Sequence, residues 1–353
     1  MKARIAVLGG DGIGPEVTAA AVRVLRAVAD RFGHELDFVE ALIGGAAIDS
    51  SGSALPPRTI DACRRSAAAL LGAVGGPQWS APSLQIRPEQ GLLELRRVLG
   101  LFANLRPVRT LPSMLDVSPL RPEVIEGVDI MVVRELTGGI YFGRKSRTAL
   151  EAEDVCSYTT AEIERVTRVA ARLALARSGR IVSVDKANVL ETSRLWREVV
   201  ERVIKVEFPG IALEHMLVDA AAMHLLRRPR HFDVLLTENM FGDILTDEAS
   251  MLAGSLGLLP SASLGDGRVG VYEPIHGSAP DIAGRGIANP FGAILSAALL
   301  LRHSLGLAEE ALAVESAVEG ALADGVRTAD VARPGVTPVG SDAATAEVVN
   351  RLR

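Results

Sequence analysis

Two aspartates four residues apart give the first indication of chemistry in this sequence. Asp243 and Asp247 lie in TENMFGDILTDEASMLAGSLG at 237–257, whose apolar spacing predicts a helix, so both carboxylates share one face of it. Among apolar neighbours such as Leu245, two bare carboxylates repel each other unless a cation intervenes. The pair therefore predicts a site for a divalent cation with oxygen ligands, and a solvated acidic face is the alternative.

Three further residues have side chains that could complete such a site. Asp219 stands at a predicted strand-to-helix junction, where it could cap the helix or serve as a third metal ligand. Lys186 follows an apolar strand, and Tyr141 lies in the segment GGIYFG. A lysine close to a metal and partly removed from water can accept a proton, and a tyrosine can return one. An ordinary strand-end lysine and a tyrosine of an extended arm are the alternatives.

Three arginines recur beside apolar residues, where a guanidinium needs an anion. They are Arg96 in RPEQGLLELR, Arg106 in ANLRP and Arg134 in VVREL. Together they predict binding of a dicarboxylate or tricarboxylate. Taken singly, each could be a surface residue or part of a structural ion pair.

Two glycine-rich segments could hold a phosphate or a cofactor. The run GGDGIGPE at 9–16 follows a strand and opens a helix, but its G-x-G-x-G spacing is not the dinucleotide pattern G-x-G-x-x-G, and a tight turn would explain it equally well. The segment HGSAPDIAGRGIANP at 276–290 contains His276, Asp281 and Asn289. Its many small residues leave backbone amides accessible, so we expect a cofactor loop, with a plain irregular loop as the alternative.

The elements that must position these residues alternate between strand and helix. Short apolar runs predict strands at 4–8, 69–74, 130–136, 180–186 and 232–237. Pro15 opens a predicted helix that reaches about Phe32, and Thr159 with Glu162 forms a capping box for a helix ending before Gly179. This alternation predicts an α/β fold. The stretch 137–158 lacks helical periodicity and predicts an extended arm suited to a partner subunit.

Composition excludes several classes of protein. With 38 Lys and Arg against 43 Asp and Glu, the net charge is −5, which argues against nucleic acid as a partner. No run of apolar residues is long enough for a membrane span, and we expect neither an export signal nor a membrane partner. Cys63 and Cys156 are far apart, which fits a reducing compartment and provides no zinc site. We therefore expect a cytoplasmic protein of about two domains.

Seven motifs occur in the order in which one known family carries them. They are GDGIGPE, RPEQGLLELR, ANLRP, VRELTGGIYFG, DKANVLE, TENMFGDILTDEASM and EPIHGSAPDIAGRGIANP. With them the chain resembles the β-decarboxylating dehydrogenases, the isocitrate and isopropylmalate dehydrogenase family, almost from end to end. The resemblance implies a two-domain α/β fold that is not a Rossmann fold, with a central mixed sheet flanked by helices.

The same resemblance implies how the chain is organised. Residues 1–101 and 254–353 would form one discontinuous, cofactor-side domain, and residues 102–253 would form a dimerisation and metal-site domain with its arm at about 137–158. The protein would be a homodimer whose active sites are shared. Lys186 and Asp219 would then reach the site of the other subunit.

The resemblance also assigns roles to the candidate residues. The malate carboxylates would be bound by Arg96, Arg106 and Arg134. Mg²⁺ or Mn²⁺ would be held by Asp243, Asp247 and the other subunit's Asp219, which also belongs to the substrate site. Lys186 would accept the hydroxyl proton, and Tyr141 would supply the proton of the final ketone. NAD would be bound by His276, Gly277, Ser278, Ala279, Asp281 and Asn289.

Substrate choice is implied by three positions that in this family face the substituent at C3 of the malate. They are Glu89, Leu92 and Leu93. The two leucines form an apolar wall that suits an isopropyl group, and the additional carboxylate of isocitrate would lose water against them and be repelled by Glu89. The implied reaction is the oxidation and decarboxylation of (2R,3S)-3-isopropylmalate in leucine biosynthesis. Sister activities on homoisocitrate, isocitrate or tartrate remain open, as does an inactive oligomeric ligand-binding protein on the same fold.

Overall fold

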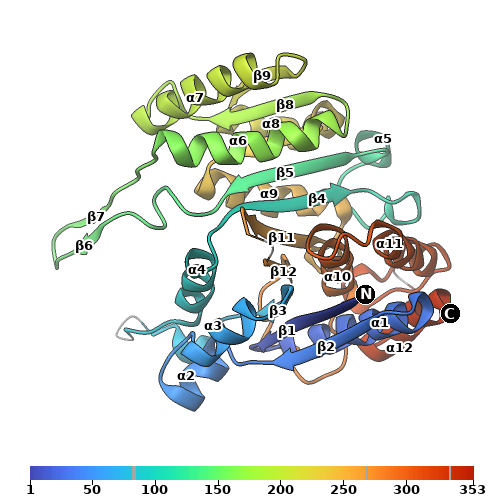
Figure 1. Cartoon of the computed structure of the whole chain (residues 1–353). Coiled ribbons are helices and arrows are strands. Elements are labelled where there is room, and N and C mark those ends of the chain that lie inside the picture. Colours follow the sequence, from blue (N-terminus) through green and yellow to red (C-terminus); the bar gives the residue numbers. More distant parts are fainter. Residues whose placement is uncertain (82–84, 268, 334) are drawn as a thin grey trace. The chain divides into compact units, whose positions relative to one another are not determined.

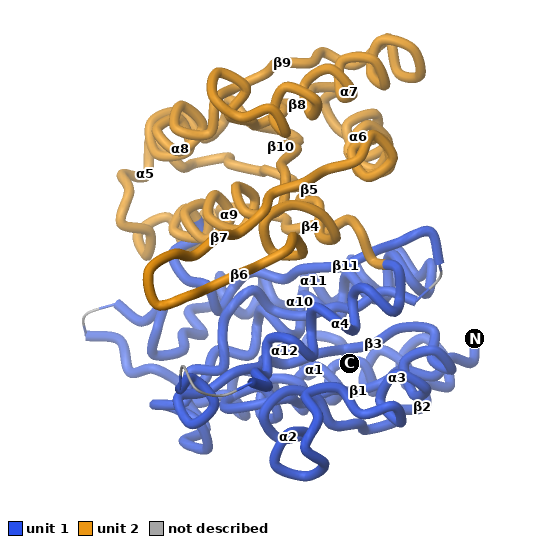
Figure 2. Tube along the Cα trace, turned by 90° about the vertical axis from the view of Figure 1, so that its left-hand side faces the viewer, with its two compact units in different colours: residues 1–100, 253–353 blue, residues 101–252 orange. Residues whose placement is uncertain are grey.

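Two units make up the chain in the computed structural model, which describes residues 1–81, 85–267, 269–333 and 335–353. Unit 1 comprises residues 1–100 and 253–353, and unit 2 comprises residues 101–252 (Figure 2). Each unit has helices packed on strands of a mixed sheet (Figure 1), so the predicted α/β class is confirmed. Among the described residues, no helix combines the length and the apolar character that crossing a membrane requires.

The strands of unit 1 follow the order β2, β1, β3, β12, β11. Their bounds are β1 Lys2–Gly10, β2 Glu35–Glu40, β3 Ala68–Ala73, β11 Pro260–Gly265 and β12 Gly270–Pro274. The first four strands in this order run parallel, and β11 pairs antiparallel with β12. Every residue of β3 is buried, as expected of a parallel strand covered on both faces.

Helices α1 and α10 pack against the strands of unit 1. Helix α11 packs against α10, and α12 packs against α1 and α11. The helices are α1 Gly14–Phe32, α2 Gly45–Ser51, α3 Pro57–Arg64, α4 Pro88–Val98, α10 Phe291–His303, α11 Ala308–Ala323 and α12 Ser341–Leu352, with 3₁₀ turns at Pro77–Trp79, Leu256–Leu258 and Ala329–Val331. The predicted helix from Pro15 to about Phe32 is confirmed as α1. Proline stands in its first turn, and Gly33 ends it in the left-handed conformation.

The strands of unit 2 follow the order β4, β5, β10, β8, β9. Their bounds are β4 Leu101–Arg109, β5 Asp129–Glu135, β8 Arg180–Asp185, β9 Ala212–Leu217 and β10 Val234–Thr237. Strands β5, β10, β8 and β9 are parallel, whereas β4 pairs antiparallel with β5.

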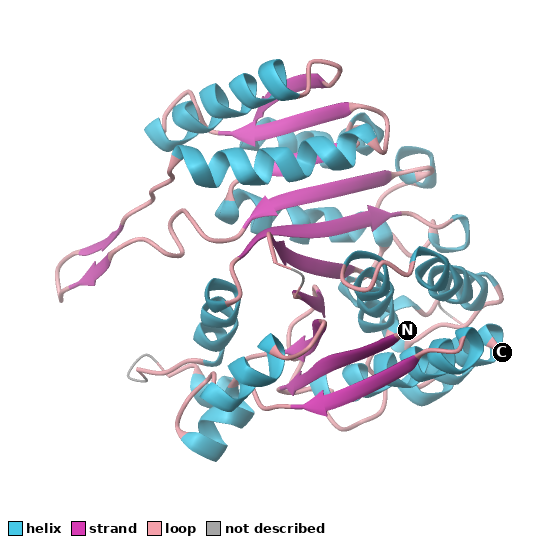
Figure 3. Ribbon diagram, in the orientation of Figure 1, coloured by secondary structure: helices cyan, strands magenta, loops and turns pink. Residues whose placement is uncertain are grey.

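The helices of unit 2 lie on both sides of its strands, with α6 and α7 in front and α8 and α9 behind in the view of Figure 3. Their bounds are α5 Pro122–Ile125, α6 Thr160–Leu175, α7 Glu191–Glu207, α8 Val218–Arg227 and α9 Asn239–Ala253, with 3₁₀ turns at Pro112–Met114 and Pro229–His231. The predicted capping box is confirmed at the start of α6. The Thr159 hydroxyl accepts a hydrogen bond from the Glu162 amide, and the Glu162 carboxylate accepts one from the Thr159 amide.

The segment 137–158 leaves β5 and returns to α6. It carries a short antiparallel ribbon, β6 Lys145–Arg147 paired with β7 Ala152–Asp154, that projects away from the sheet of unit 2 (Figures 1 and 3). All residues of both strands are exposed, and Leu150 at the turn is 99% exposed. Such a ribbon buries no core of its own, so another surface must supply any tertiary stabilisation it has.

Candidate active site

Strand register brings two of the predicted arginines onto one face of the unit 2 sheet. Strand β4 pairs with β5 so that Asn104 lies opposite Arg134. Arg106 is two residues from Asn104, and side chains two apart on a strand point to the same face. Both guanidiniums are buried, with Arg106 8% and Arg134 3% exposed. The sheet therefore presents two buried cations side by side.

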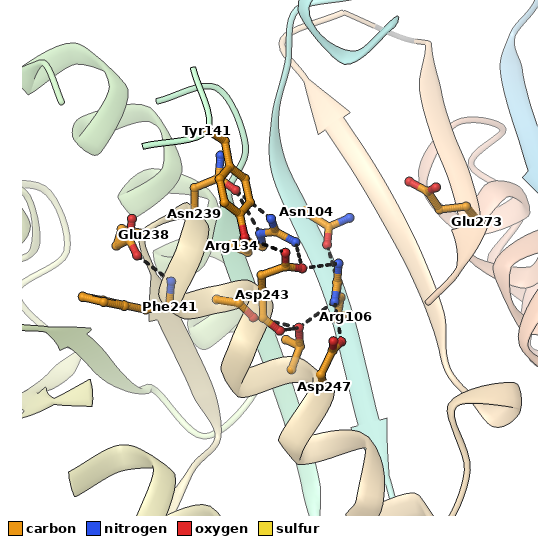
Figure 4. Close-up of polar contacts among 12 residues, drawn as sticks. Asn104, Arg106, Arg134, Tyr141, Glu238, Asn239, Phe241, Asp243, Asp247 and Glu273 are labelled. Carbon is orange, nitrogen blue, oxygen red and sulfur yellow. Dashed lines mark hydrogen bonds and ion pairs between the residues drawn. The ribbon is translucent and has the colours of Figure 1, made fainter. Parts of the chain in front are cut away.

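Helix α9 supplies the opposing carboxylates. It begins directly after β10, the strand next to β5, and carries Asp243 and Asp247 one turn apart. Arg106 Nη2 lies 3.5 Å from Asp243 Oδ1, and Arg106 Nη1 lies 3.7 Å from Asp247 Oδ1 (Figure 4). Arg134 Nη1 is paired with the same Oδ1 of Asp243. We call these four residues the arginine–aspartate cluster.

Neutral side chains fix the orientation of both arginines. The Asn239 side-chain oxygen accepts hydrogen bonds from Arg134 Nε at 3.1 Å and from Arg134 Nη2 at 2.7 Å. Arg106 donates from Nε to the Asn104 oxygen at 2.7 Å and from Nη1 to the Thr246 hydroxyl at 2.6 Å. Each guanidinium is thus held by a neutral amide and also faces a carboxylate. Because the amide fixes its orientation, the guanidinium can exchange the carboxylate for an added anion without turning away.

Tyr141 lies beside the arginine–aspartate cluster (Figure 4). Its hydroxyl donates to Asp243 Oδ2 at 3.0 Å, and the Arg134 guanidinium lies 5.9 Å from the centre of its ring. Partial burial, with a further contribution from the Asp243 carboxylate, raises the pKa of Tyr141 to about 12. The phenol is therefore protonated at neutral pH and able to donate its proton.

The two aspartates of the cluster suit a hard cation. Their oxygens are the ligand type that Mg²⁺ and Mn²⁺ prefer, and the side chains remain accessible, with Asp243 36% and Asp247 65% exposed. Partial burial and the neighbouring Asp243 raise the pKa of the Asp247 carboxyl, and Arg106 opposes this. In the described part of the chain, no three His, Cys, Asp or Glu side chains gather as one metal-binding group. The pair therefore fits a cation that takes its remaining ligands from elsewhere.

Lys186 and Asp219 form a separate pair in unit 2. Lys186 follows β8, and its Nζ lies 2.6 Å from Asp219 Oδ1. This ammonium lowers the pKa of the Asp219 carboxyl. The alternative of a helix cap at Asp219 is wrong, because Leu217 occupies the N-cap of α8 and Asp219 lies in its first turn.

The remaining predicted substrate residues lie on α4 of unit 1. Glu89 is exposed, and Leu92 and Leu93 are partly buried. Arg96 is 7% exposed, and its Nη2 pairs with Glu273 Oε1 at 2.7 Å, so the alternative of a structural ion pair is realised for one of its nitrogens. Its buried Nε has no hydrogen-bond partner among the described residues. An additional anion could satisfy that donor.

The predicted cofactor loop lies between β12 and α10 in unit 1. Gly277 and Asp281 are exposed, Ser278 is buried, and Ala279 has a φ of 37°, in the left-handed region that few non-glycine residues adopt. The buried Nε2 of His276 has no partner among the described residues, so the loop contains a polar atom that a bound cofactor could satisfy.

Asn289, at the far end of this loop, has a side chain that hydrogen bonds to other residues of the chain. Its amide donates to Asp330 Oδ2 at 2.9 Å, and its oxygen accepts from the Phe291 amide at 3.0 Å. Asn289 therefore shapes the start of α10, and its second N–H and the second lone pair of its oxygen are the groups that could contact a cofactor.

Sequence reasoning missed the neutral residues that hold the arginines. Asn239 lies four residues before Asp243 and eight before Asp247, so a helical count extended by one turn would have found it. The backbone N–H of Asn239 donates to the Tyr158 hydroxyl at 2.9 Å, and that hydroxyl donates to Glu238 Oε2 at 2.9 Å. Nothing in the local sequence indicates Tyr158, because this contact joins residues 80 or more positions apart.

Comparisons with known proteins identify the family of the chain. The family model described as isocitrate/isopropylmalate dehydrogenase matches residues 4–352. The 3-isopropylmalate dehydrogenase of Anaeromyxobacter dehalogenans is 61% identical over 94% of this chain and 95% of its own length. That of Halalkalibacterium halodurans is 57% identical over 100% of this chain and 98% of its own length.

Solved structures give the same result. The crystal structure of isocitrate dehydrogenase from Methylococcus capsulatus is similar with a TM-score of 0.88 and 34% identity, covering 99% of both chains. That of a β-decarboxylating dehydrogenase from Thermococcus kodakarensis is similar with a TM-score of 0.80 and 38% identity, covering 99% of this chain and 96% of its own. On these findings the chain belongs to the isocitrate/isopropylmalate dehydrogenase family.

Proposed function

We propose that this chain is an NAD-dependent enzyme that oxidises and decarboxylates (2R,3S)-3-isopropylmalate to 4-methyl-2-oxopentanoate and CO₂, a step of leucine biosynthesis. The observation that carries the proposal is the 57–61% identity, over nearly the full length, to relatives named 3-isopropylmalate dehydrogenase. The arginine–aspartate cluster supports it, because it combines cations for a dicarboxylate with oxygen ligands for a metal. We assign unit 1 as the cofactor-side domain and unit 2 as the dimerisation and metal-site domain.

Substrate binding follows from the buried arginines. Arg106 and Arg134 would each exchange part of their pairing with Asp243 for a substrate carboxylate, since both are held from behind by amide oxygens. The free Nε of Arg96 would donate to a carboxylate as well. Leu92 and Leu93 would contact the isopropyl group, with Glu89 beside them.

Proton transfer falls to Lys186 and Tyr141. Lys186 would accept the proton of the substrate hydroxyl in its neutral form, after the ammonium that pairs with Asp219 has released its own proton to solvent. Tyr141, whose raised pKa keeps it protonated, would supply the proton that completes the product. When bound, NAD⁺ accepts the hydride and the divalent cation polarises the oxygen at C2, which prepares loss of CO₂.

Asp243 and Asp247 would hold Mg²⁺ or Mn²⁺, with Asp219 of a second copy as a further ligand. The cofactor loop would bind NAD through the residues already named for it. Asp281 would accept hydrogen bonds from the ribose hydroxyls and repel a 2′-phosphate, which favours NAD over NADP. The free thiols of Cys63 and Cys156 are in keeping with the cytoplasmic location we propose.

Exposed apolar side chains support a homodimer formed through unit 2. Met223 and Leu226 lie three residues apart on α8, so they share a face, and both are exposed. Ile244 on α9 and Val189 before α7 are also exposed, as is Leu150 on the ribbon. A second copy packed against unit 2 would bury such side chains, and it would bring Lys186 and Asp219 to the cluster.

The decisive experiment is NADH formation with 3-isopropylmalate, isocitrate, homoisocitrate, tartrate and malate measured in parallel. At about 0.8 kcal/mol for each buried carbon, the three isopropyl carbons give roughly 60-fold preference over malate in kcat/KM. Leu93→Ser should erode this preference, and the exposed Leu312→Ser on α11 should leave it unchanged. A wild-type preference for isocitrate would overturn the substrate assignment, and no NADH with any of the five would favour a binding protein.

A further inference from the structure

The run GDGIGPE remains without a role in the proposed reaction, and its contacts in unit 1 suggest one. The Asp11 carboxylate is 5% exposed and accepts three backbone hydrogen bonds. Gly45 and Gly75 donate to Oδ2 at 2.8 Å each, and Ala46 donates to Oδ1 at 2.7 Å. The anion that this loop holds is therefore its own aspartate, which fastens the loop between β1 and α1 to the first turn of α2 and to the loop after β3.

The next two residues contact the candidate cofactor loop directly. The Ile13 amide donates to the Ser278 carbonyl at 2.8 Å. Gly12 has a φ of 58°, and a Cβ placed on it would lie 1.9 Å from that same carbonyl oxygen. Only glycine allows this approach, because the obstructing atom is backbone and cannot rotate aside.

The held carbonyl belongs to the most constrained part of the cofactor loop. Ser278 is buried, and the next residue is Ala279 with its left-handed φ of 37°. A non-glycine residue keeps such a conformation only where its surroundings enforce it. The Gly12 backbone packs against the Ser278 carbonyl and the Ile13 amide hydrogen bonds to it. Both contacts hold the Ser278–Ala279 peptide in place.

We infer that Asp11 and Gly12 are positioning residues for the cofactor: Asp11 anchors the loop 10–14, and Gly12 lets that loop hold the Ser278–Ala279 backbone in the conformation that binds NAD. The inference rests on the proposed function, since it takes NAD as the ligand of the loop 276–290. It requires no contact between NAD and either residue. Their effect therefore falls on cofactor affinity and leaves the chemistry of hydride transfer largely unchanged.

Gly12→Ala and a matched control, Gly33→Ala, test the inference. Gly33 has a φ of 70°, and a Cβ placed on it would meet nothing within 4 Å, so its substitution introduces the same left-handed strain without the clash. We expect Gly12→Ala to raise the Kd of NAD⁺, measured by isothermal titration calorimetry, by about tenfold or more. Gly33→Ala should keep the wild-type Kd. In kinetics, Gly12→Ala should raise KM for NAD⁺ with little change in kcat at saturation.

A second variant and a measurement on the wild type cover the case in which Gly12→Ala does not fold. Asp11→Asn removes the charge and one acceptor, and it should also raise the Kd of NAD⁺. In the wild type, NAD⁺ should slow hydrogen exchange of the Ala46 amide, which Asp11 holds. An unchanged Kd of NAD⁺ in the folded variants, or unchanged exchange at Ala46, would overturn this inference and leave the proposed function standing. Absence of NAD⁺ binding by the wild type would overturn the proposed function together with it.

Discussion

Charge balance is the governing feature of the proposed site at the scale of single residues. The arginine–aspartate cluster contains two cations and two anions, and the two guanidiniums are almost fully buried. A dianionic substrate added alone, or a divalent cation added alone, would disturb this balance, whereas the two together add no net charge. Coulomb interactions are strong in such a partly buried site, so the two ligands should assist each other.

The first prediction is therefore reciprocal cooperativity between metal and substrate. In calorimetric titrations, 3-isopropylmalate should lower the Kd of Mg²⁺ or Mn²⁺ by roughly 5-fold to 150-fold, the usual range of coupling between sites, and the metal should lower the Kd of the substrate equally. Asp247→Asn should weaken the coupling, and the exposed Asp342→Asn in unit 1 should not. Independent binding of the two ligands would contradict the shared site.

Tyr141 carries the second prediction. Tyr141→Phe should lower kcat by roughly 10²-fold to 10⁴-fold, the usual contribution of a general acid, with no loss of folding. Because its pKa is raised to about 12, the phenol remains protonated as pH rises from neutral to mildly alkaline values, so this residue should cause no decline in kcat there. Tyr272→Phe, which removes a hydroxyl bonded to Ser304 in unit 1, is the control. A near-normal kcat in Tyr141→Phe would remove it from the mechanism.

Asn239 carries the third prediction, as the residue that orients Arg134. Asn239→Ala removes both hydrogen bonds to the Arg134 guanidinium. It should raise KM for 3-isopropylmalate by about tenfold, since one hydrogen bond to a charged group contributes about 1.5–3 kcal/mol. KM for NAD⁺ should stay near the wild-type value. Asn350→Ala, on an exposed face of α12, provides the comparison. Equal rises in both KM values would point to general damage instead of a role in substrate orientation.

At the scale of helices and strands, the capping box of α6 has a measurable effect. Thr159→Ala removes the side-chain acceptor at the start of the helix that follows the ribbon, and we expect it to lower the free energy of unfolding by about 1 kcal/mol. Thr160→Ala deletes the same atoms one residue later, where no cap hydrogen bond is made, and should have little effect. Urea denaturation of both variants measures the difference. Equal midpoints would show that the cap contributes nothing.

The elements predicted from sequence were those with the strongest patterns. Strands β1, β3, β5, β8 and β10 correspond to the predicted apolar runs, because parallel strands covered on both faces are nearly uniform in apolar residues. Strand β4 was not predicted, since it carries the polar Asn104 and Arg106 of the site. Edge strand β2, ELDFVE, has charged residues at both ends. Function and exposure thus obscured the pattern in these two strands, and β9, β11 and β12 were not predicted either.

The candidate site was predictable only for residues whose side-chain type alone indicates chemistry. Charged and aromatic residues stood out in their motifs, and the structure brings Arg106, Arg134, Asp243, Asp247 and Tyr141 together. Asn239 and Thr246 did not stand out, because an amide or a hydroxyl gains its role from the strand register that places an arginine beside it. Register is set by tertiary packing, which local sequence does not contain.

At the scale of the whole molecule, the proposed site draws on two copies of the chain. Within one chain Lys186 pairs with Asp219, and the described residues offer no third carboxylate beside Asp243 and Asp247. We therefore predict that mixing inactive Lys186→Met with inactive Asp243→Asn restores activity, because each heterodimer regains one intact site. Mixing Lys186→Met with Asp219→Asn alters the same contributed side and should restore much less. Failure to recover activity after proven subunit exchange would indicate sites complete within one chain.

The division of unit 1 between the two ends of the chain has a consequence for biosynthesis. Strand β3 pairs with β12, so Ala68 lies beside Gly270, and α1 packs against α12. During translation the first hundred residues emerge long before these partners exist, whereas every strand of unit 2 has been made by residue 252. Since domains fold as their chain becomes available, unit 2 should fold first on the ribosome, while β3 still lacks its neighbour β12 and α1 still lacks its neighbour α12. A nascent chain stalled shortly after unit 2 has emerged would then bind chaperones through the uncovered edge of β3 and the uncovered face of α1, and release would follow synthesis of β12 and α12.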